Sequence, residues 1–515
     1  MKTVANLTLA PGRDERELYA LAAKRLGVKP GAIEELQIQR RSLDARRKGA
    51  IKFVYTVAVR LKGSPAEPPE SYEIPRLTPR GAPVVVAGFG PAGMFCALTL
   101  ARAGLRPIVL ERGADVDTRT AKVRAFRSGG ELDGECNVQF GEGGAGTFSD
   151  GKLNTGTHDR RITHVLREFA AHGAPKSVVY DAKPHVGTDV LSRVVKSIRG
   201  EIISLGGEVR FGSRLEGLVL DSGAVRGVRV VSGGLEYVQN CSALVLATGH
   251  SARDTMTALH AQGVPMEAKA FSMGARIEHL QSDLDLAQYG VPRGKRLPAA
   301  DYSLSVRLPD GRGAYTFCMC PGGEVIAAAS EHGGVVTNGM SYSGRAMPNA
   351  NSALLVGVKP EDFPYPGALG GMLWQREIEK RAFEYAGGDY KAPAQLVGDF
   401  LAGRASAVPG RVQPSYLPGV FWGDLRRVLP ETVTNGLSFA LPLLAARLPL
   451  FGDAEAVLTG PETRSSSPVR LPRGENRESA VANLYPCGEG SGWAGGITSA
   501  AVDGLRVAEA VMARF

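Results

Sequence analysis

Residues 84–93 have the sequence Val-Val-Val-Ala-Gly-Phe-Gly-Pro-Ala-Gly. The short apolar run at residues 83–87 is typical of a buried parallel strand, and residues 92–103 are good helix formers. A second predicted strand, residues 106–110, ends in Glu111. A carboxylate at this place, roughly 20 residues after the glycines, can accept hydrogen bonds from the ribose of a dinucleotide. The segment therefore predicts a β-α-β unit that binds a dinucleotide.

The residues of the predicted turn have separate structural roles. Gly88 permits the tight turn that leaves the strand, Gly90 lets a pyrophosphate approach the backbone, and Gly93 lets the helix pack closely on the sheet. Pro91 and Ala92 begin the helix, whose free N–H groups and positive dipole end would face the phosphates. An ordinary glycine-rich turn is the alternative, but the complete order of strand, helix, strand and acid favours a nucleotide site.

A second motif lies about four hundred residues later and completes the same predicted site. A short strand is predicted at residues 483–487, followed by Gly488 and Glu489, and an amphipathic helix is predicted at residues 497–512. Glu489 could bond a ribityl or phosphate-side hydroxyl. The glycines at residues 495–496 and the helix N-terminus could lie against the pyrimidine edge of a flavin. The two motifs together predict FAD as the cofactor of a redox enzyme.

Two further segments between these motifs are predicted to contact the cofactor. Residues 242–250 include a strand that ends in Ala-Thr-Gly, a common third element of FAD folds. The loop at residues 141–151 contains five glycines, so its backbone can lie close to phosphates or to the flavin ring. Ser149, Asp150 and Lys152 supply polar groups at its exit. A flexible surface loop is the alternative, and the position after the first β-α-β unit favours cofactor contact.

With these motifs the chain resembles the two-dinucleotide-binding-domain flavoproteins, and more closely the bacterial proteins known as uncharacterised FAD-dependent dehydrogenases. The matching stretches cover nearly the whole chain. They are residues 40–46, 88–93, 137–153, 249–255, 317–323, 337–341, 462–470 and the C-terminal motif. The resemblance implies an FAD-dependent enzyme, and it implies no substrate.

The sequence departs from other proteins of this fold at two places. Disulfide reductases carry a Cys-x4-Cys pair beside the flavin, whereas Cys136 stands alone in its segment. A second glycine fingerprint for a pyridine nucleotide is also missing between residues 150 and 480. NADH or NADPH would therefore have to reach the flavin directly, as a transient reductant.

The predicted cofactor contacts come from both motifs, the glycine-rich loop and the Ala-Thr-Gly strand. They are Gly88, Gly90, Pro91, Ala92, Gly93, Glu111, Arg112, Gly143, Gly144, Gly146, Thr147, Ser149, Asp150, Lys152, Thr248, Gly249, Gly488, Glu489, Gly495, Gly496 and Ile497.

Three residues near these motifs are candidates for contact with a substrate. Arg464 and Arg470 flank a serine run, and their guanidinium groups could anchor an anionic substrate over the flavin. Pairing with Glu462 or with backbone carbonyls is an equal alternative. His250 could be a proton donor near the flavin, and a capping or core role is at least as well supported.

Two cysteines complete the catalytic candidates. Residues 315–329 are predicted to form a hairpin that turns at residues 321–323. Cys318 and Cys320 are two residues apart and would share one face of its first strand. A redox-active pair facing the flavin is one interpretation, and two small buried side chains are the favoured one. A zinc site is disfavoured because two further ligands are not evident, so no metal is predicted.

Composition and charge are those of an ordinary globular enzyme, with 43% hydrophobic and 22% charged residues. No run approaches 18 uninterrupted apolar residues and no signal peptide is evident, so we expect no membrane span. Six irregularly spaced cysteines in 515 residues favour reduced thiols and a cytoplasmic protein. The net charge of +9 is spread along the chain, which argues against a dedicated nucleic-acid surface.

The predicted architecture is α/β, with a Rossmann-like FAD-binding domain of the GR2 type, split in the sequence, and a mixed, β-rich substrate cap. We expect a small N-terminal β-α-β-β domain at residues 1–62 and a Pro-rich linker at residues 63–81. The FAD-binding domain would occupy residues 82–270 and return at residues 471–515, on either side of a cap at residues 271–470.

The predicted function is transfer of a hydride between flavin N5 and a small organic substrate, with anionic molecules among the candidates. One alternative is a flavin monooxygenase of the aromatic-hydroxylase type. It ranks lower because Asp150-Gly151 lies in a different context from the Asp-Gly segment of those enzymes. The other is an RNA-associated flavoprotein that docks through the basic cluster at residues 40–48. A solvated turn is the favoured interpretation of that cluster, so we do not expect a nucleic-acid partner.

Overall fold

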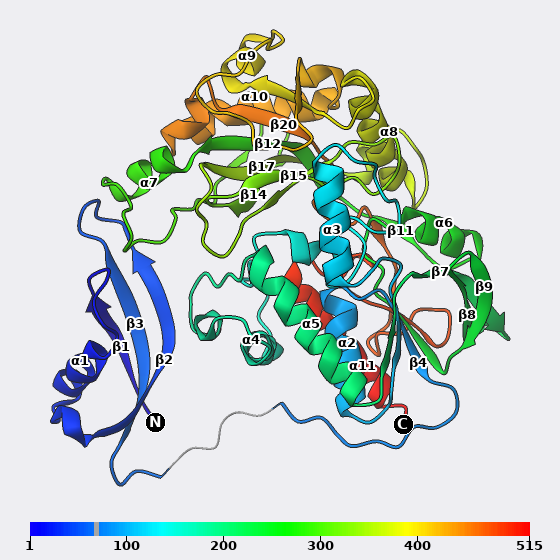
Figure 1. Ribbon diagram of the computed structural model, residues 1–515, viewed down its shortest axis with the longest axis horizontal. Coiled ribbons are helices and arrows are strands. Elements are labelled where there is room, and N and C mark those ends of the chain that lie inside the picture. The colour runs from blue at the N-terminus through cyan, green and yellow to red at the C-terminus, as the bar shows by residue number, and fades with distance from the viewer. Residues whose placement is uncertain (66–71) are drawn as a thin grey trace.

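The computed structural model describes residues 1–65 and 72–515. Figure 1 shows a small N-terminal sheet beside a five-stranded parallel sheet with its helices, and a seven-stranded sheet above. Residues 66–71, part of the predicted Pro-rich linker, lie outside the described residues. The mixed α/β class predicted from the sequence is confirmed, while the exact division into domains stays a prediction.

The parallel sheet joins the two ends of the predicted nucleotide site. Its order is β22-β10-β4-β5-β6, so β4 lies between β10 and β5, and β22 pairs with the other side of β10. The strands are β4 (Val84–Ala87), β5 (Ile108–Leu110), β6 (Glu208–Arg210), β10 (Ala243–Leu246) and β22 (Leu484–Pro486). The first and last sequence motifs therefore belong to one sheet.

Alternate side chains of β4 enter two different cores. Val84 and Val86 pack with α2 (Pro91–Arg102), α4 (Arg161–Ala171), α5 (Thr188–Ser204) and α11 (Ile497–Met512). Val85 and Ala87 pack with α6 (Arg253–Ala261) and with the antiparallel strands β7 (Ser213–Asp221), β8 (Ala224–Ser232) and β9 (Leu235–Asn240). All four strand residues are at most 1% exposed. This explains the unbroken apolar run in the sequence, because both faces of the strand are covered.

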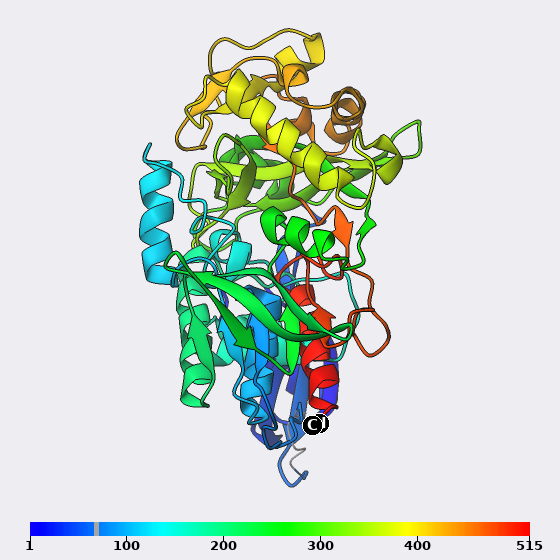
Figure 2. The same cartoon turned by 90° about the vertical axis from the view of Figure 1, so that its right-hand side faces the viewer.

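A seven-stranded sheet, which we call the cap sheet, covers the carboxyl ends of the parallel strands. Its order is β13-β14-β17-β12-β20-β18-β19, with only β18 and β19 parallel. Figure 2 shows it above the parallel-sheet region, with helices α8 (Gly370–Tyr385) and α10 (Glu431–Ala445) on top. The strands are β12 (Phe271–Leu280), β13 (Ser305–Arg307), β14 (Gly313–Cys320), β17 (Asn349–Val358), β18 (Ala392–Leu396), β19 (Val420–Trp422) and β20 (Val457–Glu462).

The hairpin predicted at residues 315–329 is wrong. β14 pairs with β13 and β17 in the cap sheet, whereas β15 (Glu324–Ala327) pairs with β16 (Thr337–Met340) in a separate two-stranded sheet. The turn between β14 and β15 packs tightly against the backbone at Arg345, since a Cβ on Gly322 would lie 2.0 Å from the backbone oxygen of Arg345. The chain therefore leaves the cap sheet at this turn instead of folding back along β14.

The N-terminal region has the predicted order of strand, helix, strand and strand. Its elements are β1 (Lys2–Leu9), α1 (Glu17–Leu26), β2 (Ile33–Asp44) and β3 (Lys52–Leu61), with β3 in the middle of an antiparallel sheet. The sheet contacts the rest of the chain through an isolated parallel bridge between Arg41 and Asp181. Arg41, a member of the basic cluster at residues 40–48, thereby makes a contact inside the molecule.

The remaining elements connect these layers. They are α3 (Val116–Arg127), β11 (Glu267–Ala268), α7 (Gln281–Tyr289), α9 (Val397–Ala402), β21 (Val469–Arg470) and the short 3-10 helices η1 (Pro30–Ala32), η2 (Gly144–Phe148), η3 (Lys176–Val179), η4 (Pro360–Asp362), η5 (Leu425–Arg427) and η6 (Pro449–Gly452). None of the helices in the described ranges combines the length and the apolar character needed to cross a membrane.

Candidate functional site

A cavity lies where the parallel strands end and the cap sheet begins. It has a volume of about 480 Å³. Residues that follow β4, β5, β10 and β22 form one part of its wall, and Phe317, Cys318 and Met319 of β14 form another. Ligands of open parallel sheets bind at the carboxyl ends of the strands. This cavity is therefore the candidate functional site.

Most of the site residues predicted from the sequence line this cavity. They are Gly88, Gly90, Pro91, Ala92, Glu111, Arg112, Gly144, Gly146, Ser149, Lys152, Thr248, Gly249, His250, Cys318, Arg464, Glu489, Gly495, Gly496 and Ile497. The predicted residues that do not line it are Gly93, Gly143, Thr147, Asp150, Gly488, Cys320 and Arg470.

The turn after β4 is closed by backbone packing that requires glycine. A Cβ on Gly93 would lie 2.0 Å from the backbone oxygen of Gly88, and one on Gly88 would lie 2.3 Å from that of Ala247. Gly90 is the N-cap of α2 and Pro91 is its first residue, and both line the cavity. The first-turn N–H groups have no acceptor within the helix. The positive end of the α2 dipole therefore points at the cavity, as the predicted phosphate site requires.

Glu111 organises the backbone around the adenosine end of the predicted site. Its buried carboxylate accepts hydrogen bonds from the backbone N–H groups of Phe89, Gly113 and Gly141, each at 2.9 Å. A carboxylate offers about four acceptor positions, so one position remains for a ribose hydroxyl. Arg112 beside it is held by two carboxylates of neighbouring segments.

Glycines at the start of α11 leave space on the cavity side. A Cβ added to Gly495 or to Gly496 would meet no atom within 4 Å. Gly488 differs, because a Cβ there would lie 2.6 Å from the Cβ of Ala92. Gly488 thus allows the two motifs to pack together, while the other two glycines border open space. The residues present fit a flat cofactor at the N-terminus of α11.

Two buried polar atoms on the cavity wall have no hydrogen-bond partner among the described residues. They are Oγ1 of Thr248 and Nδ1 of His250, at the end of the Ala-Thr-Gly strand. An unpartnered buried polar atom costs about 1–3 kcal/mol, so its retention calls for an explanation. Both residues line the cavity, and a ligand with polar groups would supply the missing partners.

The glycine-rich loop holds its shape through residues behind the cavity. Asp150 is fully buried and accepts two bonds from Arg345, with Nε–Oδ1 and Nη2–Oδ2 distances of 3.0 and 2.6 Å. Burial alone would raise the pKa of Asp150, but the charges of Arg345 and Lys152 lower it below its ordinary value. Gly143 and Thr147 are in contact, since a Cβ on Gly143 would lie 2.1 Å from the Thr147 hydroxyl. These residues support the wall.

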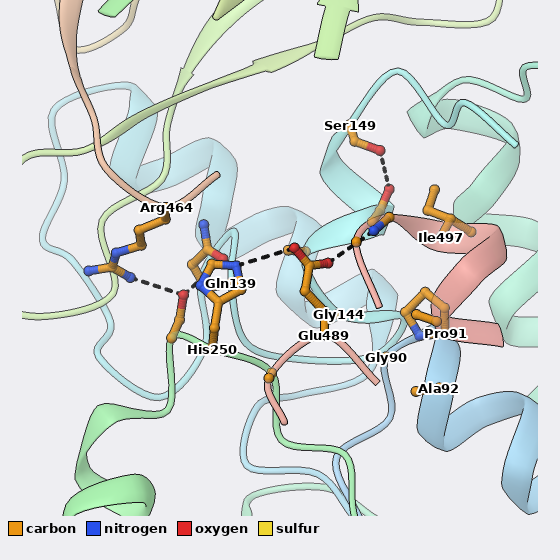
Figure 3. A pocket seen from close by; sticks show the side chains of 18 of the residues that line it. Gly90, Pro91, Ala92, Gln139, Gly144, Ser149, His250, Arg464, Glu489 and Ile497 are labelled. Carbon is orange, nitrogen blue, oxygen red and sulfur yellow. Dashed lines mark hydrogen bonds and ion pairs between the residues drawn. The ribbon is translucent and has the colours of Figure 1, made fainter. Parts of the chain in front are cut away.

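His250 and Glu489 face each other across the middle of the cavity. Figure 3 shows them between Arg464 on one side and Pro91 and Ile497 on the other. The distance from His250 Nε2 to Glu489 Oε1 is 3.9 Å. Burial, with the nearby charges of Arg464 and Arg253, lowers the pKa of His250 to about 3, so the imidazole is neutral at physiological pH. The predicted role of His250 as a proton donor is therefore limited to its neutral N–H.

Glu489 is the titratable group best suited to hold a proton at this place. Burial raises the pKa of Glu489 to about 7, although the Gly496 N–H bonds its Oε2 at 3.2 Å and the charge of Lys269 lowers the pKa. The carboxyl group is therefore half protonated near neutral pH. This suits a residue that either bonds a cofactor hydroxyl or exchanges a proton with a bound molecule.

Arg464 lines the cavity, but its charge is already balanced by a buried carboxylate. Its Nε and Nη2 donate to the two oxygens of Glu379 at 2.9 and 2.6 Å, and Nη1 donates to Ser251 and Ser330. The structural alternative predicted for Arg464 is thus the one observed, with Glu379 as partner instead of Glu462. Glu379 was missed because it precedes Arg464 by 85 residues and no local motif marks it.

Arg470 lies outside the cavity wall. Its guanidinium group stacks over the Trp493 ring, 4.9 Å from the ring centroid. An arginine over an indole face is stabilised by the ring quadrupole. Arg470 therefore connects β21 to the loop that precedes α11, and this position differs from the predicted contact with a substrate.

Glu462 is a cavity residue whose role the sequence did not indicate. It pairs with the buried Arg276, whose Nη1 lies 3.1 Å from both carboxylate oxygens. Burial nevertheless raises the pKa of Glu462 to about 7, because the loss of water outweighs the charge of Arg276. A second carboxyl group that titrates near neutrality thus lies on the cap side of the cavity.

Comparison with known proteins places the chain among flavoproteins. Residues 270–465 match a family described as "FAD-dependent protein, C-terminal domain-like". Residues 1–60 match a domain of unknown function (DUF8436). An uncharacterised protein of Clostridium beijerinckii is 47% identical over 530 residues, covering 99% of this chain and 98% of its own length.

Similar solved structures share much less with this chain. A triple mutant of the flavin-dependent brominase Bmp2 is 14% identical, over 84% of this chain and 80% of that one, with a TM-score of 0.37. Glycine oxidase from Bacillus cereus is 12% identical, over 84% of this chain and 98% of that one, with a TM-score of 0.32. Similarity at this level carries no information about the substrate.

Proposed function

We propose that the protein is an FAD-dependent oxidoreductase that transfers a hydride between flavin N5 and a small organic substrate held under the cap sheet. The chain belongs to the same family as the Clostridium beijerinckii relative, and its residues 270–465 match a family of FAD-dependent proteins. The match to a family of FAD-dependent proteins confirms the family and the cofactor predicted from the sequence. The substrate, the direction of transfer and the residues that perform it are parts of the proposal.

The single observation that carries the proposal is the continuity of the cavity. One end is lined by Glu111 and the first turn of α2, and the other by Cys318 and Asn338 of the cap region. The α2 N-terminus would hold the pyrophosphate, Glu111 a ribose hydroxyl, and the α11 N-terminus the flavin pyrimidine edge. When bound, FAD accepts or donates the hydride, and the protein supplies binding, orientation and electrostatics.

The cap side of the cavity sets the expected substrate class. Phe317 and Met319 offer apolar surface there, and Thr316 and Asn338 offer polar groups. Such a mixture suits a small organic molecule of moderate polarity. The wall therefore combines an apolar contact face with a few groups that can fix the orientation of the substrate.

An anionic substrate has a defined place in this proposal. Arg464 and Arg345 are each bound by a buried carboxylate, so neither offers a free charge. Lys183 also lines the cavity and pairs with Asp301, with Nζ 2.7 Å from Oδ1, and its side chain is 70% exposed. An acid could replace Asp301 as the partner of Lys183. Lys152, whose ammonium group donates to the Met319 carbonyl, also lines the cavity.

The proton that accompanies hydride transfer requires a group that titrates near neutral pH. Glu489 and Glu462 both have pKa values raised to about 7 by burial. Glu462 is the closer of the two to the cap strands, since it ends β20. We assign to it the exchange of a proton with the substrate, and to Glu489 a bond to the cofactor.

An anaerobic absorbance spectrum tests this function first. The protein, purified with ample FAD, is measured before and after the addition of NADH and then NADPH. Rapid bleaching of the flavin band by either nucleotide identifies a nicotinamide-fed reductase. A stable oxidised spectrum directs the search to organic substrates that reduce the flavin themselves. Protein that never retains FAD under these conditions overturns the proposal.

A further inference from the structure

A backbone irregularity places one cysteine of β14 in the cavity and a second directly behind it. The pairing of β14 with β17 shifts between Phe317 and Cys320, so β14 carries an extra residue there. Cys318 has a φ of +42°, a left-handed conformation that costs a non-glycine residue free energy. Strain of this kind persists where the surrounding structure enforces it, and it often accompanies a functional site. Cys318 lines the cavity, whereas Cys320 is fully buried.

The bulge places the Cys320 thiol against the backbone of Cys318. The Cys320 Sγ donates to the backbone oxygen of Cys318 over a distance of 3.2 Å. Regular alternation along β14 would place both cysteines on one face of the strand, as predicted from the sequence, and the bulge interrupts this alternation. The Cys320 thiol nevertheless bonds the Cys318 backbone, and both cysteines are free thiols.

Two cations favour a negative charge on the Cys318 sulfur. Arg276 donates from Nη2 to the Cys318 carbonyl at 2.7 Å and lies 3.8 Å from the Cys320 sulfur. Lys152 donates to the carbonyl of Met319. The hydrogen bond from Cys320 lowers the pKa of Cys318, burial opposes this, and the charges of Lys152 and Arg276 add to the lowering. Burial and the adjacent Cys318 raise the pKa of Cys320.

The other cysteines have the opposite electrostatic environment. Burial raises the pKa of Cys96, Cys136, Cys241 and Cys487. Each is therefore a buried thiol of low reactivity. Cys318 combines a cavity position, nearby cations and an adjacent second thiol, which is the arrangement expected of an attacking thiolate with a partner beside it.

We propose that Cys318 and Cys320 form a dithiol–disulfide pair that exchanges two electrons with FAD bound in the cavity, a step that rests on the proposed function. In the oxidation, the Cys318 thiolate and the Cys320 thiol form an S–S bond. They release one proton and two electrons, and oxidised FAD takes up both electrons and a proton. The reverse step reduces the disulfide. Arg276 and Lys152 hold the thiolate charge between turnovers.

Reductive titration of the FAD-loaded protein tests the pair by stoichiometry instead of activity. The protein is oxidised with diamide, freed of reagent and titrated with dithionite in the absence of oxygen. Wild-type protein should consume twice as many electrons per FAD as Cys318→Ser or Cys320→Ser. Cys241→Ser, which removes a buried thiol elsewhere, should behave as the wild type. Equal consumption by all four proteins overturns the proposal.

Mass spectrometry of the protein without FAD separates this result from a failure of the proposed function. After diamide treatment, the peptide that spans Cys318 and Cys320 should be two hydrogens lighter and resist alkylation until it is reduced. If this disulfide is absent, and a separate sample of the same protein loaded with FAD retains the cofactor, the proposed pair is overturned and the proposed function stands. Loss of FAD binding with the disulfide present would instead contradict the proposed function.

Discussion

Arg41 of β2 and Asp181 lie 140 residues apart in the sequence and form a two-point ion pair, with Nε–Oδ1 and Nη2–Oδ2 distances of 2.6 and 2.9 Å. Their backbones are joined as well. The Arg41 N–H donates to the Tyr180 oxygen and the Ala182 N–H to the Arg41 oxygen, each at 2.8 Å. The same segment continues to Lys183 on the cavity wall. The N-terminal sheet therefore holds a segment that forms part of the candidate site.

We expect Asp181→Asn to loosen this docking while each region stays folded. A charge-assisted pair of this geometry contributes about 2 kcal/mol. The amides of residues 180–183 should then exchange with deuterium roughly 30-fold faster in mass-spectrometric measurements. Arg46→Ala is the matched control, because Arg46 pairs with Asp44 inside the N-terminal region and is 90% exposed. The same exchange rate in both variants would show that another contact holds the segment.

Substitution of Gly93 should distinguish packing from helix propensity. Gly93 lies within α2, where alanine would ordinarily stabilise the helix by about 1 kcal/mol. Its Cβ would lie 2.0 Å from the Gly88 oxygen, so we expect Gly93→Ala to destabilise the protein by about 3 kcal/mol in urea unfolding. A stabilised variant would contradict the tight packing of α2 on the sheet.

Gly495→Ala is the counterpart on the cofactor side of the cavity. The added methyl group meets no atom within 4 Å, so the unfolding midpoint without FAD should not change. The same methyl group occupies space assigned to the flavin. We expect the steric overlap to cost about 1.4 kcal/mol or more of binding free energy, which weakens FAD binding at least tenfold. Fluorescence quenching measures this affinity. Unchanged affinity would move the flavin away from the α11 N-terminus.

Glu489→Gln should raise the stability of the FAD-free protein at neutral and alkaline pH and have little effect near pH 5. The folded-state pKa of Glu489 is about 7 and its ordinary value is 4.5. Between these values the folded protein holds a proton that the unfolded chain has released, so stability falls as pH rises through this window. The side chain is 27% exposed, and solvent screening reduces the effect. We therefore expect the unfolding free energy of the variant to exceed that of the wild type by about 2 kcal/mol at pH 8 and by little at pH 5. Thermal unfolding at the two pH values measures it.

A Glu489→Gln effect of equal size at both pH values would contradict a raised pKa. The same variant also tests the assigned bond to the cofactor, since glutamine keeps an acceptor oxygen. It should retain FAD, whereas Glu489→Ala should bind FAD more weakly.

Glu379→Gln should be strongly destabilising, because this one carboxylate bonds two buried guanidinium groups. Arg253 and Arg464 each donate two hydrogen bonds to it, over distances of 2.6 to 2.9 Å. Removal of a buried partner costs about 3–5 kcal/mol. The measurement is urea unfolding at pH 7. Burial tends to raise the pKa of Glu379, but the charges of Arg253 and Arg464 lower it below its ordinary value. The contribution of Glu379 to the unfolding free energy is therefore complete above the unfolded-state pKa and declines as pH falls through the folded-state pKa.

A neighbouring glutamate on the same helix provides the control for Glu379→Gln. Glu377 pairs with Arg381 one turn later, and both side chains are about 40% exposed. An exposed pair of this kind contributes about 0.5 kcal/mol or less. Glu377→Gln should therefore change the unfolding free energy far less. Similar losses in both variants would argue against the buried network.

The parallel sheet and its helices could be predicted from the sequence because their signals are local. The strand expected at residues 83–87 is β4, and the helix expected at residues 92–103 is α2. The C-terminal strand and helix are observed as β22 and α11. β4, α2 and β22 each end within two residues of a glycine, and α11 begins directly after one, so the physical reason lies within about ten residues of chain.

The cap side could not be predicted in the same way because its pairings join distant segments. Two apolar runs around residues 321–323 look like a hairpin, but their partners are β17 and β16. The balance of charge at Arg464 depends on Glu379, which no sequence motif connects to it. Local sequence patterns predict which residues are buried. They do not predict which buried charged residues pair with one another.

The order of strands in the parallel sheet also constrains how the protein is made. During synthesis, β4 and α2 leave the ribosome long before β22 and α11, with the entire cap sheet translated between them. Until then β10 has an open edge and the apolar face of α2 that meets α11 is uncovered. The nascent chain therefore keeps these surfaces exposed until α11 has been translated, and the proposed FAD site can be complete only after that point.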